Sequence, residues 1–208
     1  MVALGAMTHR VLAFVVLAVA STRVEAQTVQ ISPFGSFEFG GTLSSPAFES
    51  VFSLGSSFGY GGTVDISVAK GWRVELLYSR QKTDLVGPGG SAGPRFDLAV
   101  ERYMVGIEEE KGEEGGKTRP FGVFLLGATR LVPTLGQYGS DSRFTLGLAL
   151  GVKLFLSKNV GFRFEGRGFY TPVETNASLL CTNGNCLFGA SGSGLFQGDL
   201  GAGLIIAF

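Results

Sequence analysis

The residues that could do chemistry in this chain are acids and bases, and histidine is missing from among them. The only histidine is His9, close to the start of the chain. Imidazole is the usual group that activates a serine or a water molecule at neutral pH, so its absence elsewhere argues against hydrolytic catalysis. We therefore expect no catalytic residue, no bound cofactor and no metal site.

Ten charged residues occupy alternate positions within segments that alternate between apolar and polar side chains. Successive side chains of a β-strand point to opposite faces, so residues two apart share a face. Acids and bases on an enclosed face have to neutralise one another, because an unpaired buried charge is costly. We predict that they form an ion-pair network inside a barrel: Glu38, Asp65, Arg73, Glu75, Arg130, Lys153, Arg163, Glu165, Arg167 and Asp199.

Five further acids form a dense run at Glu108, Glu109, Glu110, Glu113 and Glu114. Such a run could bind a cation, but a charged turn in solvent is its more common role, and we interpret it as a turn. Bases and acids are balanced at 17 of each, so no nucleic acid partner is expected.

Two cysteines, Cys181 and Cys186, bracket the sequence Thr-Asn-Gly-Asn. Asn-Gly is typical of a two-residue hairpin turn, and disulfides persist in exported proteins, so the spacing predicts a local disulfide. Two free thiols are the alternative. A metal site would need further Cys or His ligands nearby.

The elements that must position these residues show a period of two, most clearly in the segment 143–156. Its large apolar side chains from Phe144 to Leu156 alternate mostly with glycine, alanine and threonine, which inverts the surface of a soluble protein. The last segment, 195–208, repeats the pattern with Phe196, Leu200 and Leu204 on one face. Apolar-out and polar-in alternation is typical of a transmembrane β-barrel strand.

Eight segments carry this alternation: 29–41, 58–69, 72–79, 96–109, 119–131, 143–156, 160–171 and 195–208. Within 96–109, Leu98 and Val100 fall out of phase, and a β-bulge near Val100 would restore the pattern. The connections alternate between short turns (70–71, 110–117, 157–159) and long loops (42–54, 85–94, 132–141, 172–193). The sequence therefore predicts an all-β fold, an eight-stranded antiparallel up-and-down transmembrane β-barrel.

The start of the chain resembles an export signal. Arg10 is followed by a ten-residue apolar run, Val11 to Ala20, and by a small-residue cleavage site after Ala26. We predict a signal peptide over 1–26 and one barrel domain over 27–208, with an uncleaved anchor as the alternative. Beyond residue 26, no segment approaches 18 uninterrupted apolar residues, and membranes otherwise admit only closed barrels.

The signal, the sequence Pro-Phe-Gly-Ser-Phe-Glu-Phe-Gly-Gly at 33–41, the eight segments and the terminal Phe208 together resemble small Gram-negative outer-membrane barrels of the OmpA transmembrane-domain and OmpX type. The resemblance covers 27–208. It implies that Leu204, Ile206 and Phe208 form the signal read by the barrel-assembly machinery. It also implies periplasmic termini, extracellular long loops and outer-membrane lipid as the surroundings.

The resemblance implies architecture more than role. The leading hypothesis is a monomeric, non-enzymatic barrel with a structural or surface-interaction role and a lumen plugged by ion pairs; no surface partner can be named. A narrow pore or conduit for small solutes is the alternative, favoured by inward-facing glycines that could leave space: Gly59, Gly61, Gly147, Gly151, Gly201 and Gly203. A soluble periplasmic ligand-binding barrel is a third possibility.

Overall fold

The computed structural model describes residues 29–45, 50–88, 95–112, 116–134, 139–172, 178–182, 185–189 and 194–208. The predicted signal peptide over 1–26 lies outside these residues and stays a prediction, as do the roles of Glu113 and Glu114. Within the described parts of the chain, no helix is long and apolar enough to cross a membrane.

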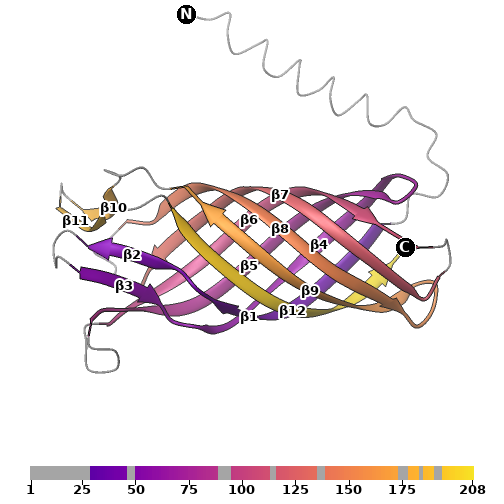
Figure 1. Cartoon of the computed structure of the whole chain (residues 1–208), viewed down its shortest axis with the longest axis horizontal. Coiled ribbons are helices and arrows are strands. Elements are labelled where there is room, and N and C mark those ends of the chain that lie inside the picture. The colour runs from indigo at the N-terminus through magenta and orange to yellow at the C-terminus, as the bar shows by residue number, and fades with distance from the viewer. Residues whose placement is uncertain are drawn as a thin grey trace, which may run out of the picture.

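Eight long antiparallel strands form a closed barrel (Figure 1). They are β1 (Val29–Phe39), β4 (Ser57–Ala69), β5 (Trp72–Val86), β6 (Arg95–Glu110), β7 (Thr118–Pro133), β8 (Asp141–Phe155), β9 (Val160–Thr171) and β12 (Leu195–Ala207). Each strand pairs with the next in this order, and β12 pairs with β1 to close the cylinder. The predicted fold class is confirmed.

The strands are staggered around the barrel by ten residues. From Val29, the cross-strand partners lead through Ile66, Val74, Ile107, Phe124, Leu148, Gly168 and Gly198 back to β1 at Phe39, ten positions further along. Stagger of this kind requires strands tilted by about 35–45° from the axis, and eight strands leave an interior that side chains can fill.

The outer surface of the barrel is apolar, as the alternation predicts. Leu148 and Leu150 of β8 are 64% and 75% exposed, and Leu200, Leu204 and Ile206 of β12 are exposed as well. Exposed aromatic residues lie toward both ends of this belt, with Trp72 and Phe208 at one end and Phe58, Phe144 and Phe196 at the other. A soluble barrel would bury this face, so that alternative is excluded.

The two rims of the barrel differ. The turn end carries the connections β4–β5, β6–β7 and β8–β9 together with the start of β1 and the end of β12, on the right in Figure 1. The loop end carries the longer connections. At the turn end Gly71 has φ +74°, a left-handed conformation that glycine adopts without strain, in the predicted turn 70–71.

Two of the predicted loops contain short strands. Segment 42–54 forms the hairpin β2 (Thr42–Ser45) and β3 (Ser50–Leu54), and segment 172–193 contains β10 (Ser178–Thr182) and β11 (Asn185–Gly189). These strands extend the sheet at the loop end, since β3 pairs with β5 and β11 with β2 (Figure 1). The loop assignment was wrong here because four or five residues are too few to show a period.

The predicted bulge near Val100 is also wrong. The register of β6 with both neighbours is unbroken, and Leu98 and Val100 point into the barrel in phase with the rest of the strand. The inward side chains of β6 at the loop end are apolar: Leu85 and Leu131 are buried near this level as well, and Val100 is the cross-strand partner of Leu131 on one side and of Gln81 on the other. We call Leu85, Leu98, Val100 and Leu131 the apolar cap.

The inverted surface leads to a prediction about stability in lipid. Leu150 lies midway between Phe144 and Leu156 on the outer face of β8. We expect Leu150→Arg to lower the free energy of unfolding in phosphatidylcholine vesicles by ~2–4 kcal/mol and Leu156→Arg, at the turn end, by only ~0–1 kcal/mol. Urea unfolding followed by heat-modifiable gel migration measures both, and equal losses would contradict the belt.

Candidate functional site

The interior of the barrel is built around Arg163 of β9. Its guanidinium lies 3.1 Å from Asp65 Oδ2, 2.5 Å from Glu75 Oε2, 2.9 Å from Glu165 Oε2 and 3.4 Å from Glu108 Oε2. These carboxylates come from β4, β5, β9 and β6, so one cation joins four strands. Arg163 is fully buried, and charge-assisted hydrogen bonds of this kind are among the strongest in proteins.

A second cation, Lys153 of β8, completes the cluster toward the turn end. Its Nζ lies 2.5 Å from Glu108 Oε1, 3.3 Å from Glu110 Oε2 and 3.0 Å from Gln30 Oε1. Arg73 of β5 approaches the same Glu110 at 3.4 Å. We call Asp65, Arg73, Glu75, Glu108, Glu110, Lys153, Arg163 and Glu165 the lower ion cluster.

Glu165 connects this cluster to a second group of charges nearer the loop end. It accepts hydrogen bonds from both Arg163 and Arg167, and Arg167 lies 3.8 Å from Asp199. At a similar depth, Arg102 donates to Glu38 at 2.6 Å, with both side chains fully buried. Beyond these pairs the hydroxyl of Thr145 lies 2.7 Å from that of Thr129 and 2.8 Å from that of Thr171.

Phenylalanine rings pack against three of the arginines. Arg163 lies 4.4 Å from the ring centroid of Phe121, Arg167 4.1 Å from Phe34 and Arg102 4.5 Å from Phe169. These rings belong to one buried apolar cluster, which also contains Leu77, Met104, Val123, Leu125 and Ala149. A buried cation over an aromatic face gains further stabilisation, so ionic and apolar side chains fill the lumen together.

The inward glycines do not leave an open path, contrary to the expectation attached to a conduit. A Cβ at Gly61 would lie against the backbone carbonyl oxygen of Tyr78 and 2.6 Å from Phe34 Cζ, and one at Gly151 would lie against the carbonyl oxygen of Phe164 and 2.5 Å from Phe121 Cζ. At Gly147 it would lie 3.1 Å from the ring of Phe169. The missing side chains thus make room for phenylalanines, and only around Gly201 are the nearest atoms at ordinary contact distance, 3.5 Å or more.

Nine of the ten residues predicted to form the ion-pair network lie buried in the interior: Glu38, Asp65, Arg73, Glu75, Lys153, Arg163, Glu165, Arg167 and Asp199. Arg130 is the correction. It points outward from β7, its side chain is 45% exposed, and its nearest acid is Glu101 at 3.8 Å. The inward face of β7 carries Phe121, Val123 and Leu125 instead. Because both faces of this strand are apolar, the alternation did not show whether the face carrying Arg130 points into the lumen.

Three interior charges are missing from the predicted ion-pair network. Glu108 and Glu110 belong to the run predicted to form a solvated turn, but both reach into the lumen and contact Lys153. Arg102 was left out of the predicted network, although it lies in phase with Met104 and Glu108 on β6. This shared phase of the alternation was the sequence signal that could have identified Arg102 as an inward residue.

The carboxylates of Asp65, Glu75 and Glu108 are close enough to share one cation, since an oxygen of each lies within 4.8 Å of the others. Arg163 contacts all three, at 3.1, 2.5 and 3.4 Å. The guanidinium therefore supplies the positive charge that such a group of acids requires.

The predicted disulfide and assembly signal lie apart from this interior. Cys181 and Cys186 are directly opposite each other in the β10–β11 hairpin, and partners in such a pair have Cα atoms about 4.5–5.5 Å apart, a spacing that a disulfide can bridge. Their side chains are outside what the structure describes, so the bond stays a prediction. Leu204, Ile206 and Phe208 are exposed on the outer face of the last strand or just after it.

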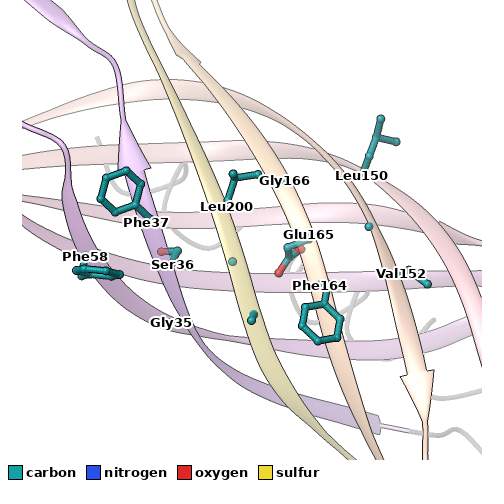
Figure 2. A pocket seen from close by; sticks show the side chains of 13 residues that line it. Gly35, Ser36, Phe37, Phe58, Leu150, Val152, Phe164, Glu165, Gly166 and Leu200 are labelled. Carbon is teal, nitrogen blue, oxygen red and sulfur yellow. The ribbon is translucent and has the colours of Figure 1, made fainter.

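The outer wall carries a hollow of about 790 Å³ across β1, β12, β9 and β8. Gly35, Gly166 and Ala202 are among its lining residues, and Phe37 and Phe58 lie on one side of it and Phe164 on the other (Figure 2). A second hollow shares Gly35, Phe164 and Ala202 and continues to Phe162 and Leu204. Both open on the apolar outer surface of the barrel.

No model of a protein family matches the chain, and no curated protein matches it. Solved structures do. Neisserial surface protein A superposes with a TM-score of 0.57 at 16% identity, covering 88% of this chain and 98% of its own. The chain has the fold of an outer-membrane β-barrel. The resemblance to small outer-membrane barrels is thereby confirmed at the level of the fold.

Two further solved barrels are similar. The outer membrane protein OprG from Pseudomonas aeruginosa has a TM-score of 0.57 at 13% identity, covering 88% of this chain and 97% of its own. The outer membrane protein AlkL, solved by solid-state NMR in DMPC lipid bilayers, has a TM-score of 0.55 at 10% identity, covering 90% and 93%.

Arg163 and Arg130 offer a matched pair for testing the lower ion cluster. Arg163→Gln leaves four carboxylates without their shared cation, and we expect a loss of ~3–5 kcal/mol in the free energy of unfolding. Arg130→Gln removes the same charge from an exposed position and should cost ~0–1 kcal/mol. Urea unfolding in lipid vesicles compares them; a small loss for Arg163→Gln would show that the cluster contributes little.

A second pair of variants tests whether the space beside the inward glycines is already filled. Gly151→Ala places a Cβ against both the Phe121 ring and the backbone carbonyl oxygen of Phe164 and should destabilise the barrel by ~1–3 kcal/mol. At Gly62, on the outer face, the nearest atoms to a new Cβ are 3.8 Å away, and the same substitution should stay within ~0.5 kcal/mol of wild type. Equal unfolding midpoints for the two variants would argue for a roomier lumen.

Proposed function

We propose that this protein is an integral, non-enzymatic outer-membrane barrel with a closed lumen, which supports the envelope or presents its loop end to partners at the cell surface. The observation that carries the proposal is the interior, where Arg163 joins four buried carboxylates and Phe34, Phe121 and Phe169 occupy the space beside the glycines. Such an interior braces the wall and obstructs solute passage.

The apolar belt with aromatic residues near both ends supports a position in the membrane. We infer that the turn end and both ends of the barrel domain face the periplasm and that the loop end faces outside, as in barrels with alternating short and long connections. Leu204, Ile206 and Phe208 would then be the residues presented to the barrel-assembly machinery, and outer-membrane lipid would surround a monomer.

The absence of enzymatic activity is inferred from composition. The chain has a single histidine, His9, which falls within the proposed signal peptide. The buried acids that could act as a catalytic pair are engaged by arginine and lysine, as Glu75 and Glu165 are by Arg163. Among the described residues of the interior, a nucleophile would therefore lack a free base to activate it.

The loop end is the part that would meet a surface partner. The β2–β3 and β10–β11 hairpins extend the barrel wall there, and a Cys181–Cys186 disulfide would fix the second hairpin at its tip. The bond would limit the conformations of the hairpin before binding, which lowers the entropic cost of recognition.

Conductance in planar bilayers tests the closed lumen. The purified protein should give no steady unitary current, whereas a large porin reconstituted in the same way confirms that the assay detects channels. Unitary currents from the wild type that disappear in Arg163→Gln or Arg167→Gln would overturn the proposal in favour of a narrow pore. Heat-modifiable migration of each variant shows that it is folded.

A further inference from the structure

Three charged residues form a row on the outer face of the barrel at the loop end. Arg80 of β5 is the cross-strand partner of Glu101 of β6, and Glu101 is the partner of Arg130 of β7. The side chains of Arg80 and Arg130 are 34% and 45% exposed, whereas that of Glu101 is only 9% exposed. The acid is thus covered and the two guanidiniums face outward.

The row lies at the edge of the apolar belt. One step toward the turn end on the same face, Tyr78 and Tyr103 are cross-strand partners with ring centroids 5.1 Å apart, and Tyr60 is the partner of Arg80. Beyond the tyrosines the outer face is apolar, with Leu76 and Val105. Tyrosine is enriched where a membrane meets water, so the row lies at the depth of lipid headgroups.

The row has an excess of positive charge. Arg80 Nη1 lies 3.3 Å from Glu101 Oε1, and Arg130 Nη1 lies 3.8 Å from Glu101 Oε2, so one carboxylate is shared between two guanidiniums. Glu101 also accepts a hydrogen bond from the Tyr103 hydroxyl at 3.3 Å. Lys82, exposed on the same face of β5, adds a further positive charge next to Arg80.

Nearby acids do not neutralise this excess at the same level. Asp84 and Asp97 are cross-strand partners further toward the loops, and Asp84 lies 3.9 Å from Arg95. An anion placed between the two arginines from outside would supply the missing charge.

We propose that Arg80 and Arg130 bind the phosphate of a membrane lipid headgroup. The two arginines are separated by one strand, so their Cα atoms are about 10 Å apart and their long side chains can converge on one group. The planar guanidinium matches phosphate geometry with two parallel hydrogen bonds. Glu101 keeps the two guanidiniums at the surface in this arrangement. The inference rests on the proposed position in a membrane.

Lipid selectivity in vesicles tests the site. Spin-labelled phosphatidic acid and spin-labelled phosphatidylcholine are compared in phosphatidylcholine vesicles containing the full barrel, and electron paramagnetic resonance gives the fraction of each lipid held at the protein surface. Wild type should prefer phosphatidic acid. Arg80→Gln and Arg130→Gln should each lower the preference about two- to fivefold, and the double variant should abolish it.

Lys158→Gln is the matched control, since Lys158 is exposed at the turn end and the substitution removes the same charge. It should leave the preference near that of wild type. The site is overturned if the double arginine variant keeps the wild-type preference, if wild type shows none, or if Lys158→Gln lowers the preference as much as Arg80→Gln. Absence of any preference in a wild-type barrel that shows heat-modifiable migration would refute the site alone, whereas failure of the wild type to enter vesicles would refute the proposed function as well.

Discussion

The pairing of β12 with β1 is the interaction on which the rest of the structure depends. In hydrocarbon, backbone amide and carbonyl groups that lack a partner are costly, so a sheet can cross only if its first and last strands meet. Once the ring is closed, every inward side chain is confined to a narrow cylinder. The alternation then decides the polarity of both sides, with apolar side chains facing outward and charges confined within.

Confinement makes charge balance inside the barrel a condition of folding. Seven inward carboxylates, from Glu38 to Asp199, face Arg73, Arg102, Lys153, Arg163 and Arg167, with Arg119 at the rim contacting Glu110. Because Arg163 joins strands that are far apart in the sequence, its contacts form only when the cylinder is complete. The ion pairs therefore favour one arrangement of the strands over the alternatives and also stabilise it.

Much of this architecture could be predicted from the period-two pattern, because each of the eight alternating segments corresponds to one of the eight long strands. The pattern failed where both faces are apolar, as at Arg130 in β7, and where charges are dense, as at Glu108. The partners of Arg163 could not be predicted, since they depend on the ten-residue stagger, which no local pattern encodes. The β2–β3 and β10–β11 hairpins at the loop end were not predicted, because their strands are too short to show a period of two.

The apolar cap lies between the exposed rim and the ion-filled interior. Along β6 the inward side chains pass from Glu108 through Arg102 to Val100 and Leu98, so on this strand the filling changes at the loop end from ionic to apolar. The buried side chains of Gln81 and Thr83 lie on the neighbouring strand opposite Val100 and Leu98, so the apolar cap is a local cluster on one side of the loop end. A change in the connecting segments above it would therefore alter the loop end while leaving the ion-filled interior undisturbed.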